Sequence, residues 1–176
     1  MDGVVLIIVD FQEKLAPHIE DVEEVVRNSR KLIKALNIID IPVVVTEQIK
    51  LGRTIPEISE LIDNFKPIEK TSFSCMKNRD FERKLKELNV KSCILIGIET
   101  HICILQTAID LKRAGYEVYV VVDCVGSRRR SDKNVAVMRL ISEGVRVTSA
   151  ESIIYELLET AEHPKFRDIL KIVKEN

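Results

Sequence analysis

The chain has 176 residues, with 27 lysines and arginines against 28 aspartates and glutamates, and 45% of its residues are hydrophobic. This length suits one domain with a sizeable core, so we expect a single domain over residues 1–176. The balanced charge argues against nucleic-acid binding, and every apolar run is far shorter than the roughly 20 residues that span a membrane. No secretory leader follows Met1, and four cysteines do not make a disulfide framework, so we expect a cytoplasmic protein.

Short apolar runs rich in β-branched residues predict the strands of a parallel sheet. Because these runs are continuous rather than alternating, both faces of each strand should be buried. The runs cover residues 3–9, 41–45, 92–96 and 117–122, with weaker candidates at 67–69 and 145–148.

Apolar residues at helical spacing lie between the strands. These stripes cover residues 22–36, 58–65, 102–109, 135–141, 154–161 and 166–173. We expect Ser131 to cap the fourth helix, Thr148 and Glu151 to form a capping box before the fifth, and Pro164 to occupy the first turn of the last. Strands alternating with helices predict a three-layer α/β/α fold, in which ligands bind beyond the carboxyl ends of the strands.

Three reactive side chains follow predicted strands at that edge. Asp10 ends the first strand, Lys70 follows the third, and Cys103 lies near the start of the helix after the fourth. Each alone has an ordinary structural explanation, since aspartate is common in turns, lysine on surfaces and cysteine in cores. Their coincidence at one sheet edge is what favours a catalytic site.

The chemistry of these three side chains is coherent. A cysteine in the first turn of a helix has a lowered pKa and attacks as the thiolate. Asp10 would take the thiol proton and return it to a leaving amine, while Lys70 would hold Asp10 ionised and stabilise the thiolate. Backbone amides before Cys103 would bind the oxyanion of a tetrahedral intermediate. These parts predict acyl transfer through a thioester-type intermediate.

Five segments of the chain carry a resemblance to a known family. They are Val9-Asp10-Phe11-Gln12, Glu69-Lys70-Thr71-Ser72-Phe73-Ser74, Gly97-Ile98-Glu99-Thr100-His101-Ile102-Cys103-Ile104-Leu105-Gln106-Thr107-Ala108, Gly115-Tyr116-Glu117-Val118 and Asp123-Cys124-Val125-Gly126-Ser127-Arg128. These segments resemble the isochorismatase-like cysteine hydrolases, and the tail is most similar to their isochorismatase domain-containing branch. The resemblance implies a six-stranded parallel sheet in the order 3-2-1-4-5-6, an Asp10–Lys70–Cys103 triad and a homo-oligomer. It also implies a cis peptide at Ile98–Glu99 that aims the amides of Glu99 and Cys103 at an oxyanion.

Differences from known branches narrow the expected chemistry. Isochorismatases proper cleave a vinyl ether and typically lack the cysteine, so Cys103 argues against isochorismate. Nicotinamidases carry a histidine metal site after the second strand, whereas residues 46–52 contain no histidine, and His18, His101 and His163 are scattered. We therefore expect a hydrolase without metal or cofactor that acts on a small amide or carbamoyl compound. The alternatives are a non-catalytic binding protein, or a hydrolase of isochorismate-like or nicotinamide-like substrates.

Further residues are candidates for the surroundings of the site. Phe11, Glu99 and Arg128 are the candidate substrate-binding or oxyanion residues. Arg128 begins the only strong charge run, which is either a solvated loop or the source of a bidentate fork for a substrate carboxylate. His101 is expected to be a pocket or interface residue rather than the base.

The remaining cysteines receive structural interpretations. Cys93 belongs to a buried strand, and Cys75 follows the Lys70 motif on a loop that could border the pocket. Cys124, near the end of the fifth strand, either lines the site or packs in the core.

Overall fold

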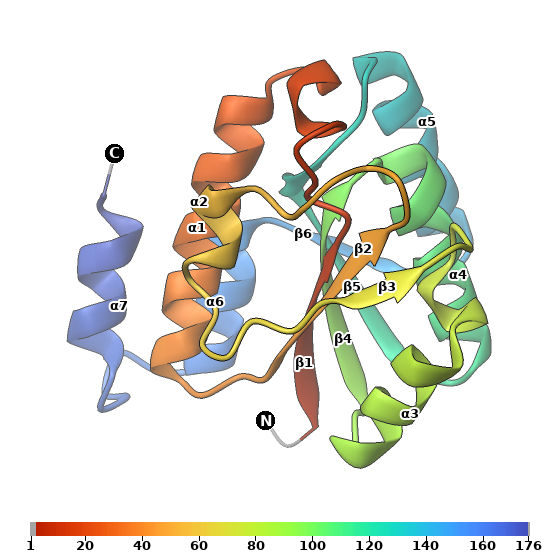
Figure 1. Cartoon of the computed structure of the whole chain (residues 1–176). Helices are drawn as coiled ribbons and strands as arrows, with labels where there is room; N and C mark the ends of the chain where they lie inside the picture. The colour runs from red at the N-terminus through yellow and green to blue at the C-terminus, as the bar shows by residue number, and fades with distance from the viewer. Residues whose placement is uncertain (1–2, 176) are drawn as a thin grey trace.

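A computed structural model describes residues 3–175. Six parallel strands form one sheet in the order β3-β2-β1-β4-β5-β6, which confirms the predicted topology (Figure 1). The strands are β1 (Val4–Val9), β2 (Val43–Gln48), β3 (Ile68–Lys70), β4 (Ser92–Ile98), β5 (Glu117–Gly126) and β6 (Arg146–Thr148).

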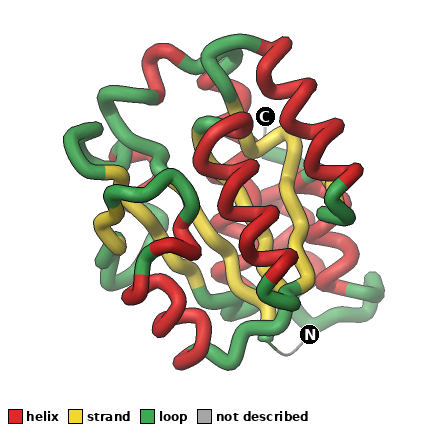
Figure 2. Tube along the Cα trace, turned by 90° about the vertical axis from the view of Figure 1, so that its right-hand side faces the viewer, coloured by secondary structure: helices red, strands yellow, loops and turns green. Residues whose placement is uncertain are grey.

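Helices cover both faces of this sheet and complete the predicted three layers. One face packs against α1 (Val22–Ile38), α2 (Pro56–Ser59), α6 (Ala150–Leu158) and α7 (Phe166–Val173). The other packs against α3 (Arg79–Glu87), α4 (Leu105–Arg113) and α5 (Arg130–Ser142), the side that faces the viewer in Figure 2. Within residues 3–175, no helix combines the length and apolarity needed to cross a bilayer.

The central strand β1 shows why continuous apolar runs become buried strands. All six of its residues are buried. Val4, Leu6 and Ile8 point into the core beneath α1, whereas the alternate residues point into the core beneath α3–α5. Because successive side chains of a strand face opposite sides, a strand covered on both faces needs apolar residues at every position.

The face of α5 that meets the core differs from the predicted one. The expected stripe of Val135, Met138 and Ile141 is exposed, at 54%, 62% and 58%. Ala136 and Leu140 form the buried face instead. Because one of these two buried residues is the small Ala136, the inward face carries less apolar side chain than the outward face.

Smaller elements also differ from their predictions. The stripe at 58–65 forms helix only at Pro56–Ser59, and the turns after it close by i→i+3 hydrogen bonds such as Leu61 N to Ile58 O. Ser149, not Thr148, caps α6, because its hydroxyl accepts from Ser152 N.

Two other helix starts are corrected. Pro164 precedes the N-cap residue Lys165 of α7, so it lies outside the helix. Arg129, not Ser131, occupies the N-cap position of α5.

A glycine shapes the end of β4. Gly97 has φ +128°, and a Cβ atom there would lie 2.0 Å from the carbonyl oxygen of Val9. The pairing of β4 with β5 shifts register between Leu95 and Gly97. The backbones of β1 and β4 therefore meet closely at the point where both strands reach the edge that carries the candidate residues.

Candidate active site

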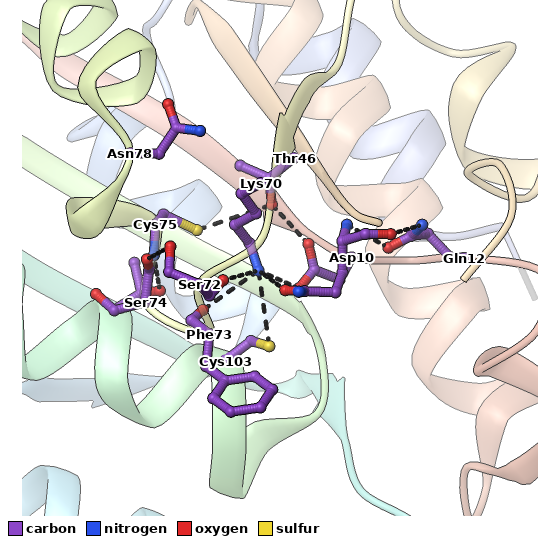
Figure 3. A network of polar contacts seen from close by, with 12 residues as sticks. Asp10, Gln12, Thr46, Lys70, Ser72, Phe73, Ser74, Cys75, Asn78 and Cys103 are labelled. Carbon is purple, nitrogen blue, oxygen red and sulfur yellow. Dashed lines mark hydrogen bonds and ion pairs between the residues drawn. The ribbon is translucent and has the colours of Figure 1, made fainter. Parts of the chain in front are cut away.

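The three predicted catalytic side chains meet at the carboxyl edge of the sheet (Figure 3). Asp10 follows β1 in a left-handed conformation (φ 53°), and Lys70 is the last residue of β3. Cys103 lies in a π-helical turn, Thr100–Ile104, between β4 and α4. Lys70 Nζ is 2.7 Å from Asp10 Oδ2 and 3.8 Å from Cys103 Sγ. The lysine therefore joins the carboxylate to the thiol.

Strand β2 supplies two further polar groups, which the sequence argument missed. The Thr46 hydroxyl donates to Asp10 Oδ1 at 2.8 Å, and Lys70 Nζ donates to Gln48 Oε1 at 2.8 Å. Because β2 lies between β1 and β3, its last residues fall between Asp10 and Lys70. The predicted strand order could have pointed to Thr46 and Gln48, because it places their strand between the strands of Asp10 and Lys70.

Backbone carbonyls of the loop after β3 complete the lysine's surroundings. The Ser72 and Phe73 carbonyl oxygens lie 3.1 and 3.2 Å from Lys70 Nζ. The Lys70 and Asp10 side chains are fully buried, so their charges face each other without water. A buried ammonium has three N–H donors that need acceptors, and the four oxygens around Lys70 Nζ satisfy them and fix its position.

Burial dominates the protonation of the site. It raises the pKa of Asp10, and Lys70 opposes this. Burial lowers the pKa of Lys70, but the charge and hydrogen bond of Asp10, together with Cys75 and Cys103, outweigh it, so the pKa is raised and the ammonium persists. Burial, with the charge of Asp10, also raises the pKa of Cys103, and Lys70 only partly offsets it.

The predicted lowering of the pKa of Cys103 is therefore wrong for the free site. Cys103 is only 7% exposed and stands in the π-helical turn rather than in the first turn of α4. Desolvation outweighs a helix-dipole effect of this kind. The thiol is neutral at rest, and a buried carboxylate with a raised pKa beside it is suited to accept its proton.

A second polar cluster surrounds Glu99, next to the nucleophile's turn. Its buried carboxylate has Oε1 2.6 Å from Arg128 Nε and Oε2 3.4 Å from His101 Nε2. His101 Nδ1 is 2.9 Å from Ser127 Oγ. The Ile98–Glu99 peptide is cis, as the resemblance implied. Arg128 is thus tied to Glu99 while the rest of its side chain is exposed.

The other candidates lie in the interior. Phe11 is fully buried in the core beneath α1. Cys75 is buried beside the site, with Sγ 3.8 Å from Thr46 Oγ1, and burial raises its pKa to about 11. Cys93 and Cys124 are buried in the two cores.

One cavity lies away from the triad. Its volume is about 640 Å³, and residues of α1, α5 and the end of β5 line it, including Asp21, Asp123 and Lys133. Among residues 3–175, no three histidine, cysteine, aspartate or glutamate side chains are grouped as metal ligands.

Fold and site together define a three-layer α/β/α protein with a buried Asp–Lys–Cys group at the carboxyl edge of a parallel sheet. The Isochorismatase domain matches residues 4–152, and the chain belongs to this family. It is 37% identical to mouse isochorismatase domain-containing protein 2A over 99% of this chain and 84% of that protein. The zebrafish isochorismatase domain-containing protein 2 is 39% identical, over 97% of this chain and 87% of that protein.

Solved structures share the fold over nearly the whole chain. The MAR1 ribonuclease from Caenorhabditis elegans is 38% identical, with a TM-score of 0.92 over 100% of this chain and 93% of that one. YcaC from Escherichia coli, described as an octameric hydrolase of unknown specificity, has a TM-score of 0.87 at 20% identity, over 97% of this chain and 94% of that one. The predicted family and fold are confirmed, and the family is one of hydrolases.

Proposed function

We propose that the protein is a metal- and cofactor-independent cysteine hydrolase that cleaves the C–N bond of a small amide or carbamoyl compound. The observation that carries this proposal is the buried contact of Lys70 Nζ with both Asp10 Oδ2 and Cys103 Sγ. A structural ion pair does not require a thiol beside it, whereas nucleophilic catalysis requires a thiol, a proton acceptor and a fixed charge within reach of one another.

In the proposed reaction, Cys103 Sγ attacks the substrate carbonyl carbon as its proton passes to Asp10. The oxyanion accepts hydrogen bonds from the amides of Glu99 and Cys103. Collapse breaks the C–N bond, and Asp10 protonates the leaving amine. Water then attacks the thioester and gives a proton to Asp10, which returns it to Cys103 as the acid leaves. Lys70 stays protonated throughout and keeps Asp10 in place.

Proteins of the same fold support a nucleophilic site and an oligomer. YcaC from Pseudomonas aeruginosa, 22% identical with a TM-score of 0.90, is described with covalent acrylamide, a reagent that alkylates nucleophilic side chains. The E. coli YcaC is an octamer, and we propose a homo-oligomer here too. All four cysteines are free and buried, which fits the proposed reducing, cytoplasmic setting.

Ribonuclease activity is the second candidate, because the C. elegans relative is named a ribonuclease. The residues of this chain favour the small amide. Arg128 is paired with Glu99 and Arg130 with Asp21, so two of the three arginines in the only strong basic run are neutralised. The triad is also buried, whereas phosphate contacts require exposed cations.

The proposal is tested with a panel of small amides, carbamoyl compounds and RNA, using wild type, Cys103→Ala and Cys75→Ala. Cys75→Ala is the matched control, because it removes a buried thiol near the same lysine. We expect amine release by wild type and Cys75→Ala, a rapidly quenched reaction that shows the acyl mass on Cys103, and no turnover by Cys103→Ala. Turnover by Cys103→Ala, or RNA cleavage without amide cleavage, would refute the proposal.

A further inference from the structure

The outer face of α5 is apolar although solvent covers it in the single chain. Within residues 3–175, four large hydrophobic side chains are exposed, and Val135, Met138 and Ile141 are three of them. The helix buries its opposite face, through Ala136 and Leu140, against the sheet and against the turn that carries Cys103. A helix that is apolar on both sides is typical of one covered on both sides.

The centre of this face carries no charge, in a chain in which 31% of the residues are charged. We define the α5 outer face by the exposed residues Ser131, Asn134, Val135, Met138, Ile141 and Ser142, and the exposed residues Arg130 and Arg139 flank it on its two sides. Charged residues are depleted from the centres of protein interfaces relative to the rest of the protein surface. The pattern therefore indicates a partner protein rather than solvent.

The side-chain types on this face are matched about Met138, which favours a second copy of this chain as the partner. Val135 and Ile141 lie three residues on either side of Met138, and Asn134 and Ser142 lie four residues on either side. A two-fold axis that pairs two antiparallel copies of α5 at Met138 places Val135 against the partner subunit's Ile141. It also places the Asn134 amide near the partner subunit's Ser142. A two-fold interface requires such self-complementarity, and an unrelated partner does not.

We propose that the α5 outer face is the two-fold contact between copies of this chain, with Met138 facing the partner subunit's Met138. This inference rests on the homo-oligomer proposed above and names its surface. Because α5 packs on the Thr100–Ile104 turn, the contact also supports the element that carries Cys103 from outside.

The test uses Met138→Glu and Met138→Lys, with masses measured by sedimentation and light scattering. Each substitution puts two like charges at the axis, so each variant should have half the mass of wild type. An equimolar mixture should regain the wild-type mass, because Glu then faces Lys. The matched controls are Ala161→Glu and Ala161→Lys, at an exposed position before α7, and these should keep the wild-type mass.

The possible failures are distinct. Wild type that is monomeric at all concentrations overturns both the oligomer and this surface. Wild type that is oligomeric with both Met138 variants at full mass overturns the surface alone. Half-mass variants that do not recombine on mixing overturn the two-fold pairing at Met138. Circular dichroism and the melting temperature verify that each variant is folded, and Met138 is exposed enough to accept either charge.

Discussion

Replacing Lys70 with methionine tests whether the buried pair with Asp10 is as tightly coupled as its geometry indicates. Both side chains are fully buried, and Lys70 Nζ lies 2.7 Å from Asp10 Oδ2. Methionine keeps most of the volume but removes the charged partner of the Asp10 carboxylate, which keeps the hydrogen bond from the Thr46 hydroxyl. Breaking a buried ion pair by removing one partner costs about 3–5 kcal/mol.

The assay is urea unfolding followed by far-UV circular dichroism at a fixed protein concentration. Urea unfolding gives the loss of unfolding free energy directly. In a thermal scan, at about 2–4 °C per kcal/mol for a chain of this size, the melting temperature of Lys70→Met should fall by roughly 6–20 °C. The matched control is Lys171→Met, which removes an exposed pair with Asp168 at 3.2 Å and should cost at most about 0.5 kcal/mol.

A double variant separates coupling from packing. Asp10→Asn with Lys70→Met leaves no buried charge, so its cost should be below the sum of the two single costs by about 1–3 kcal/mol. The cost of Lys70→Met should also be lower at mildly acidic pH. Without Lys70, burial raises the pKa of Asp10 further, and the native state then recovers stability by binding a proton. A loss below about 1 kcal/mol for Lys70→Met, or strict additivity, would refute this reasoning.

Two further predictions concern the backbone and the buried thiols. Gly97→Ala should lower the unfolding free energy, measured in urea, by about 3 kcal/mol or more. Gly115→Ala is the control, because Gly115 also has a positive φ but open space around its Cβ position, and it should cost about 1–2 kcal/mol. Equal costs would contradict the close β1–β4 contact. Burial raises the pKa of Cys93 to about 12. At a pH above the pKa of the unfolded thiol, the native state therefore holds a proton that the unfolded chain has released. The unfolding free energy then falls as the pH rises. Cys93→Ala should make that decline shallower by at most about 1.4 kcal/mol per pH unit, and an unchanged slope would exclude the thiol as its source.

The sequence predicted the elements whose signal is local and strong. The continuous apolar run over residues 3–9 predicted a strand buried on both faces, and its end placed Asp10 at the sheet edge. Lys70 and Cys103 followed from the same rule, and the resemblance to the family supplied the strand order. Helix α3 escaped notice, because Phe81 and Leu85 are its only buried residues in a highly charged stretch.

What the sequence could not supply depends on packing between distant segments. The apolar stripe on α5 was assigned to the core because periodicity reports which face is apolar and not which face is covered. The pKa of Cys103 was predicted in the wrong direction because burial arises from all the segments around the thiol. The Thr46 and Gln48 contacts arise in the same way, from a neighbouring strand.

Alkylation of Cys103 with limiting iodoacetamide, in wild type and Asp10→Asn, tests the central claim most directly. Peptide mass spectrometry gives the rate for each cysteine at neutral pH. We predict that Cys103 reacts fastest in wild type and that Asp10→Asn slows it, because Asp10 accepts the thiol proton. If Asp10 acts only through its charge, which raises the pKa of Cys103, its removal should speed the reaction. A faster reaction in Asp10→Asn, or a Cys103 no more reactive than Cys75, would contradict the proposed catalytic site.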